Sequence, residues 1–326
     1  MFHRFLAALC IVALPVHAQS GLVEAAKKEG SLLLYTTTPP EYLKELVEPF
    51  ERQYGIKVNV WRARSEAVLT RVIGEARGNH AVVDVVHSIS PPMEALHREG
   101  LLQPVDSPHH KDLAPGAVPA HRAWASTLVY VFVQAYNTQK VAKAELPRTY
   151  RDLLDPRWKG RLGIESSDHE WMNAVIKGMG EEPGVRFFRD LVRTNGLSVR
   201  TGHPLLTNLT SSGEVPLALT VYQYSVEQAK RKGAPIDWFV FEPAVAIADG
   251  IAIANKAPNP NAARLFYDYM LSPDAHRILA KIGYLPTSTK VARPLKGVKL
   301  NILDAGALLD DQATSLARFE GILQGR

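Results

Sequence analysis

The sequence predicts an α/β protein with two lobes. Strand-like runs alternate with amphipathic helical segments from residue 31 onwards, which is typical of parallel sheets covered by helices on both faces. A long run of β-branched and aromatic residues, 126–138, then suits a strand that crosses between lobes, and a second α/β series follows it. The length of 326 residues exceeds the usual size of one hydrophobic core and also favours two domains.

The first lobe is predicted from alternating strands and helices. Residues 31–36, SLLLYT, form a short buried-strand run, and residues 40–54 place apolar side chains at helical spacing before Gly55. The series continues with a strand at 56–61, a helix at 65–78 with Ser65 as its N-cap, and a strand at 81–88.

The second lobe has its own strands and helices, and the chain then returns to the first lobe. A second α/β stretch begins at residue 149, with a loop at 158–160 that leads into a strand. An amphipathic helix at 182–196 and a strand at 214–224 follow. Residues 236–257 are typical of strands that lead back, and two helical segments and a polar tail end the chain. We therefore expect the first part of lobe one at 19–125, the crossing strand and lobe two at 126–238, and the return strand, the remainder of lobe one and the C-terminal helices at 239–326.

The N-terminus has the pattern of a secretory signal peptide. One arginine precedes an apolar run, and Val16-His17-Ala18 is a cleavage pattern that predicts removal of residues 1–18. No later segment approaches the roughly 20 apolar residues that span a bilayer, so we expect a soluble exported protein. The only cysteine, Cys10, lies within the signal, which excludes thiolate chemistry. The net charge of +5 is too small and too scattered to indicate nucleic-acid binding.

Three segments give the chain its resemblance to a known family. They are TYRDLLDPRWKGRLGI (149–164), SSGEVPLALTVYQY (211–224) and NPNAARLFYDYMLSPDAHRILAKIGYLPTST (259–289). In this order they resemble the periplasmic solute-binding proteins of bacterial ABC importers, in the type 2 class that includes ferric-iron, thiamine and polyamine binders. The resemblance implies a two-lobed type 2 fold, in which each lobe holds a mixed, mainly parallel sheet with flanking helices and crossover hinge strands join the lobes.

Such a hinge leaves a cleft between the carboxyl ends of the two sheets, where open α/β sheets bind ligands. The ligand contacts that we expect there are Thr36, Thr37, Thr38, Arg64, Ser65 and Ser88 from lobe one, with Ser166, Ser167, Tyr222 and Tyr224 from lobe two. The two tyrosines share one side of an extended strand. Asp168 and Glu170 are interpreted as charges stabilised at the start of a helix.

Ferric iron is one of two ligand classes under consideration. In the ferric-binding branch two adjacent tyrosines follow the strand that ends near residue 221 here. Gln223 takes the first place and Tyr224 the second, with Tyr222 shifted by one. The histidine and glutamate of many members correspond to Pro39 and Ile89. Phenolates suit Fe(III), which family members carry as transported ligand with a synergistic anion. The metal ligands expected if iron is bound are Tyr222, Tyr224 and His87.

The second ligand class is a small oxyanion such as a phosphonate, phosphate ester or carboxylate. Hydroxyl groups, an arginine fork and backbone N–H groups at helix N-termini converge on the predicted cleft, and such donors suit an anion.

The expected role is transport rather than catalysis. The sequence contains no G-x-S-x-G, H-E-x-x-H or G-x-x-x-x-G-K-[ST] motif, so a hydrolase would have to assemble its site from scattered residues. We expect a periplasmic monomer, without an obligatory cofactor, that closes over one ligand and delivers it to an ABC permease. A ligand sensor that docks on a membrane receptor is the alternative.

Overall fold

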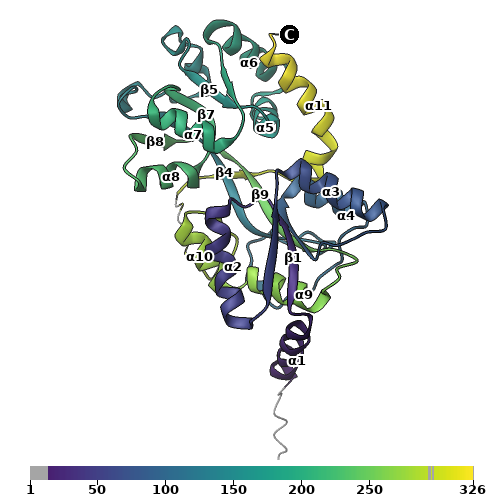
Figure 1. Cartoon of the computed structure of the whole chain (residues 1–326). Helices are drawn as coiled ribbons and strands as arrows, with labels where there is room; N and C mark the ends of the chain where they lie inside the picture. Colours follow the sequence, from purple (N-terminus) through teal and green to yellow (C-terminus); the bar gives the residue numbers. More distant parts are fainter. Residues whose placement is uncertain (1–13, 293–294, 296, 326) are drawn as a thin grey trace, which may run out of the picture.

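The computed structural model describes residues 14–292, 295 and 297–325, and these form two lobes that share one sheet (Figure 1). Along this sheet the strands follow the order β2-β1-β3-β9-β4-β7-β5-β6. In this order, lobe one contains β2, β1, β3 and β9, and lobe two contains β7, β5 and β6. β4 takes part in both lobes.

Lobe one has a mixed sheet with helices on both faces. β1 (Ser31–Thr36) pairs in parallel with β2 (Lys57–Arg62) on one side and β3 (Val85–Ile89) on the other. Because side chains alternate along a strand, Leu34 packs with Phe50 on one face and Tyr35 with Val68 on the other. The helices are α1 (Leu14–Glu29), α2 (Pro40–Tyr54), α3 (Ser65–Arg77), α4 (Ser90–Arg98), α9 (Pro260–Met270) and α10 (Pro273–Ile282).

Lobe two repeats this arrangement with fewer strands. β5 (Leu162–Glu165) pairs in parallel with β6 (Ser198–Arg200) and β7 (Leu217–Tyr222), and β4 pairs antiparallel with both β7 and β8 (Ile236–Phe239). Its helices are α5 (His169–Met179), α6 (Glu181–Asn195), α7 (His203–Ser212) and α8 (Gln223–Arg231). Short 3-10 helices lie at His110–Asp112, Lys143–Glu145, Tyr150–Leu154 and Pro156–Trp158.

Two long antiparallel strands connect the lobes. The first half of β4 (Ala125–Asn137) pairs with β9 (Ala244–Ile253), whereas its second half pairs with the strands of lobe two. The short strands β10 (Leu285–Pro286) and β11 (Leu300–Ile302) add to β4 and β9. The predicted two-lobed α/β fold with crossing strands is confirmed.

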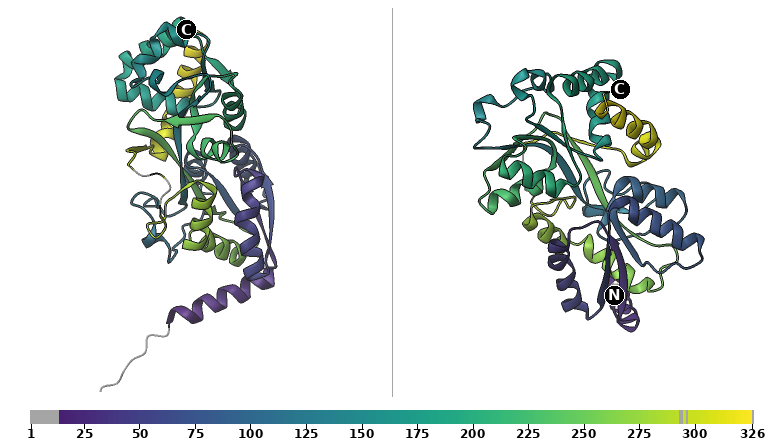
Figure 2. Two further views of the ribbon diagram at one scale, coloured as in Figure 1. Left: turned by 90° about the vertical axis from the view of Figure 1, so that its left-hand side faces the viewer. Right: turned by 45° about the horizontal axis from the view of Figure 1, so that its top comes forward.

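The C-terminal segment is a helix instead of the predicted polar tail. α11 (Ala305–Leu323) begins against α4 in lobe one and then runs along α5 and α6 in lobe two (Figures 1 and 2). Asp304 caps it by accepting a hydrogen bond from the Ala307 N–H at 2.8 Å, and its apolar face buries Phe319 and Ile322. The end of the chain therefore packs on both lobes and not on lobe one alone.

The predicted signal peptide lies mostly outside the described residues, because residues 1–13 are not among them. The expected cleavage point after Ala18 falls within α1, at the end of lobe one that is remote from lobe two (Figure 1). Among the helices of the described residues, none is both long enough and apolar enough to cross a bilayer.

Candidate functional site

A cavity of about 500 Å³, here called the interlobe cavity, lies between the two lobes. Its floor is formed by the crossing strands, through Tyr130 and Phe132 of β4 and Ile247 of β9. The chain at the carboxyl ends of β1, β2 and β3 lines it from lobe one, and the chain after β5, β6 and β7 lines it from lobe two. This is the edge where open α/β sheets place their ligands.

Tyr222 and Tyr224 both line this cavity from lobe two. β7 ends at Tyr222 and α8 begins at Gln223, so Tyr224 lies in a first helical turn and not on an extended strand as predicted. The two rings still lie close together, with centroids 6.0 Å apart, while Gln223 is buried outside the lining. Tyr222 stacks on His203 at 4.0 Å and on Tyr130 at 4.7 Å, and its hydroxyl forms no hydrogen bond within the part of the chain described.

A carboxylate and an imidazole lie beside Tyr222. Asp168 Oδ1 lies 3.1 Å from His203 Nε2, and both side chains line the interlobe cavity. Asp168 Oδ2 is buried and makes no hydrogen bond among the described residues, although the Thr220 hydroxyl is close enough to lower the pKa of this carboxyl. One buried Asp168 oxygen therefore keeps its hydrogen-bonding capacity unused.

Glu165 organises the loops that carry this pair. Its donor atom lies within 4.8 Å of those of Asp168 and His203. Its carboxylate already accepts hydrogen bonds from the Ser167 N–H at 2.5 Å, the Ser167 hydroxyl at 2.6 Å and the Gly202 N–H at 2.8 Å. Because these hydrogen bonds occupy the Glu165 carboxylate, its role is to hold the loops after β5 and β6 in position. Asp168 and His203 remain the groups of this trio that can bind a ligand.

Burial controls the protonation of the lobe-two wall. It raises the pKa of Glu170 to about 8, and it raises the pKa of Asp168 and the pKa values of both Tyr222 and Tyr224. Burial alone would lower the pKa of His203, but the attraction of Asp168 and the neighbouring carboxylates raises it above its ordinary value. At neutral pH the empty site therefore holds protons on Glu170 and on both phenols.

The lobe-one wall carries two arginines and one carboxylate, that of Glu66 in the first turn of α3. Arg62 ends β2 and Arg64 directly precedes α3, and both are exposed and line the interlobe cavity. Neither arginine forms an ion pair within the residues that the structure describes. Ser65 begins α3, whose first N–H groups lack intrahelical partners. This wall can donate hydrogen bonds to an anion.

The structure brings together some of the predicted ligand contacts and not others. Those lining the interlobe cavity are Thr37, Arg64, Ser65, Ser167, Tyr222 and Tyr224. Those outside the lining are Thr36, Thr38, His87, Ser88 and Ser166. His87 is buried, its Nδ1 lies 3.1 Å from the Thr38 hydroxyl and its Nε2 lies 2.9 Å from the Thr127 hydroxyl. Both ring nitrogens are engaged, so we do not count His87 among the available metal donors.

Sequence reasoning missed three groups in this site. Asp168 and Glu170, interpreted as charges at a helix start, do lie there but also line the cavity. His203 follows Gly202, whose φ of 101° is accessible mainly to glycine, at the first position of α7. The sequence Gly-His-Pro after a short strand was the available signal for a side chain presented at a helix N-terminus.

Comparison with known proteins identifies the family. The sequence profile described as "Bacterial extracellular solute-binding protein" matches residues 81–309. This chain belongs to that family. The solute-binding protein is 22% identical over 318 residues to the Fe(3+)-binding periplasmic protein of Serratia marcescens, covering 92% of this chain and 93% of the relative. The predicted resemblance is thus confirmed, and the family is one of solute-binding proteins and not of enzymes.

Solved structures share the fold of this solute-binding protein. Iron-bound HitA from Pseudomonas aeruginosa matches with a TM-score of 0.76 at 22% identity, covering 90% of this chain and 99% of that chain. AfuA from Actinobacillus pleuropneumoniae, solved with fructose-6-phosphate bound, matches with a TM-score of 0.79 at 21% identity, covering 91% and 99%. One fold therefore serves different ligands, and the ligand has to be argued from the cavity itself.

Proposed function

We propose that this protein captures ferric iron in the interlobe cavity and presents it to an ABC permease. The observation that carries this proposal is the opposite chemistry of the two walls. Lobe two offers phenol and carboxyl oxygens, which are hard donors suited to Fe(III), and lobe one offers two unpaired guanidinium groups. A ferric ion on lobe two with an anion on lobe one complements both walls.

The proposed ligands balance the charge of the ion. Tyr222 and Tyr224 supply two phenolates and Asp168 supplies one carboxylate, so that three negative charges meet Fe(III). The charge of the metal favours ionised phenols, although burial raises their pKa values in the empty protein. A synergistic anion would complete the coordination sphere and pair with Arg64.

Transport follows from closure of the lobes. The donors lie on both lobes, which β4 and β9 connect. A ligand that bridges the two lobes binds the closed state more tightly than the open state and therefore favours closure. We infer that residues 1–18 direct export, that the mature protein acts as a periplasmic monomer, and that the permease reopens it. No bond is made or broken in the cargo.

Loading with ferric citrate tests the proposal. We expect a visible phenolate-to-iron charge-transfer band that weakens in Tyr222→Phe, where Tyr224 remains as a phenolate ligand. A protein that stays colourless, with no change in its melting temperature on iron loading, would contradict ferric binding.

A free organic phosphate or carboxylate is the second candidate. Arg62 and Arg64 beside the N-terminus of α3 favour it, and AfuA shows that this fold accommodates fructose-6-phosphate. Under this alternative, fructose-6-phosphate or inorganic phosphate raises the melting temperature without iron, and Arg64→Ala removes that shift. A shift that needs iron supports the ferric proposal instead.

A further inference from the structure

A second cavity, here called the rear cavity, lies on the other side of the crossing strands and has a volume of about 650 Å³. Neighbouring residues on these strands face opposite ways. Tyr130 and Ile247 line the interlobe cavity, whereas Val129 and Ala248 line the rear cavity. The remaining walls come from residues 114–121, the start of α4, residues 285–287 and residues 300–306 before and within the start of α11.

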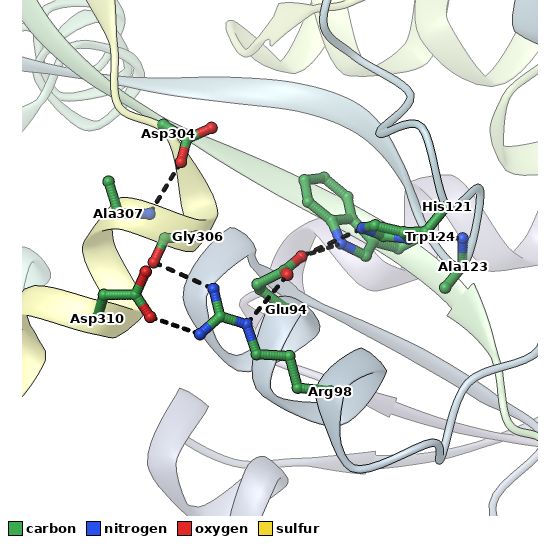
Figure 3. A network of polar contacts seen from close by, with 9 residues as sticks. All are labelled: Glu94, Arg98, His121, Ala123, Trp124, Asp304, Gly306, Ala307 and Asp310. Carbon is green, nitrogen blue, oxygen red and sulfur yellow. Dashed lines mark hydrogen bonds and ion pairs between the residues drawn. The ribbon is translucent and has the colours of Figure 1, made fainter.

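A hydrogen-bonded network fixes one wall of the rear cavity (Figure 3). Glu94 Oε2 lies 3.2 Å from His121 Nε2 and accepts a hydrogen bond from Trp124 Nε1 at 3.4 Å, while Glu94 Oε1 pairs with Arg98 at 3.3 Å. The Ala123 N–H donates to His121 Nδ1 at 3.0 Å, which places the proton of the neutral ring on Nε2, facing Glu94. The carboxylate is therefore held in place at the cavity.

This network is not arranged to hold a metal ion, although His97 brings a third donor atom within 4.8 Å of Glu94 and His121. The rings of His97 and His121 stack with centroids 3.6 Å apart and an interplanar angle of 15°. A nitrogen lone pair lies in the plane of its ring, so two parallel stacked rings cannot both direct one at the same ion. The group is better understood as a polar wall.

We propose that the rear cavity binds a small, mostly apolar molecule that is neutral or carries one ammonium group. Its volume lies in the range of roughly 300–1,000 Å³ typical of small-molecule sites, which are mostly apolar with a few fixed polar groups. The apolar walls are Val118, Pro119, Trp124, Val129, Leu285, Pro286, Ile302 and Leu303.

Charge and hydrogen bonding narrow the class of ligand. Glu94 and Asp304 are the acidic residues of the lining, and no lysine or arginine lines the cavity among the described residues, so an anion is disfavoured. Ser90 is fully buried beneath the lining and exposes no surface to the cavity. The Glu94 side chain keeps 13% of its surface exposed, so its carboxylate is the polar group that a hydroxyl or ammonium of the guest can reach.

Three probes with one ring and different charges test this proposal on the whole protein: benzylamine, benzyl alcohol and benzoate. Calorimetric titration should show binding of benzylamine and benzyl alcohol, and benzoate should bind at least several-fold more weakly. Equal binding of all three, or no binding of any at millimolar concentration, would overturn the proposal.

Three variants test whether the probes bind in the rear cavity. Ala248→Leu should fill the rear cavity and abolish binding of benzylamine, whereas Ala63→Leu, in the lining of the interlobe cavity, should leave it intact. Glu94→Gln, which removes only the negative charge of this side chain, should weaken benzylamine several-fold relative to benzyl alcohol and covers the case in which Ala248→Leu does not fold. Benzylamine binding that survives Ala248→Leu in a folded protein, or that Ala63→Leu abolishes, would refute the site; iron loading reports separately on the interlobe cavity.

Discussion

The two walls of the interlobe cavity differ in charge and in burial. Lobe two contributes phenols, carboxyl groups and an imidazole, and Glu165 and Asp168 there are almost fully buried; lobe one contributes exposed arginines and a helix N-terminus. Buried donors hold a cation in a fixed geometry, whereas exposed guanidinium groups can adapt to the shape of an anion. This difference suits the cargo that we propose, which has two parts: lobe two binds the ferric ion, and lobe one binds its counter-anion.

Removal of the Tyr222 hydroxyl should have the largest effect. Tyr222→Phe deletes a proposed iron ligand, so the iron affinity should fall by more than the roughly 10–100-fold that loss of an outer-shell partner costs. Competition with citrate, followed at the charge-transfer band, measures this change. Tyr54→Phe on α2, outside the cavity lining, is the matched control, and an equal loss there would mean that the effect is not local.

Acidification should have the second-largest effect on iron binding, which it should weaken. The empty site holds protons on Tyr222 and Tyr224, whose pKa values are raised by burial, and Fe(III) must displace these protons from its ligands. The apparent affinity should therefore rise with pH by about tenfold per unit for each proton released. Titrations between pH 6 and pH 8, corrected for the proton binding of citrate, measure the slope. A flat profile would argue for a ligand held by lobe one alone.

Loss of a lobe-one cation should have a smaller effect that depends on the anion. Arg64→Ala should reduce iron affinity roughly tenfold, close to the loss of one charge-assisted hydrogen bond, when a synergistic anion is present. Without the anion the variant and the parent should bind alike. Arg77→Ala, an exposed arginine in the last turn of the same helix, is the control and should change neither value.

The smallest effect is expected at the contact between α11 and lobe one. On lobe one, Arg98 donates a hydrogen bond to the Gly306 carbonyl and forms an ion pair with Asp310. On lobe two, α11 forms an ion pair with Lys177 and hydrogen bonds with His169 and Asn173. Arg98→Ala should leave the melting temperature nearly unchanged and speed hydrogen exchange a few-fold in the first turns of α11 only. Faster exchange along the whole helix would show that lobe one holds it more strongly than these contacts indicate. Arg277→Ala, which removes another exposed pair, should not alter this exchange.

Sequence patterns predicted most elements of the fold because each depends on local periodicity. The strand at residues 31–36 and the helix at 40–54 agree with β1 and α2, and the run at 126–138 agrees with the crossing strand β4 within one residue. α11 was missed because its buried positions are few and separated by polar residues, and its apolar face is defined by two lobes that local sequence does not show.

The site was less predictable than the fold. The sequence locates the end of a strand but not which of two neighbouring residues faces the cavity, and this explains why Ile89 lines it while Ser88 is buried. The same alternation leaves Thr37 in the lining and Thr36 outside it. His203 and Asp168 come from different loops, and their approach depends on the pairing of β5 with β6.

The sequence is sufficient to predict two α/β lobes joined by crossing strands, a resemblance to periplasmic solute-binding proteins, and two tyrosines where a strand gives way to a helix at the cleft. These features follow from period, turn residues and short segments, which act locally. The long-range packing of the chain places carboxyl groups and His203 beside the tyrosines on one wall, engages both ring nitrogens of His87 with threonine hydroxyls, and forms a second cavity behind the hinge. Such choices depend on strand register and on contacts between segments far apart in the chain.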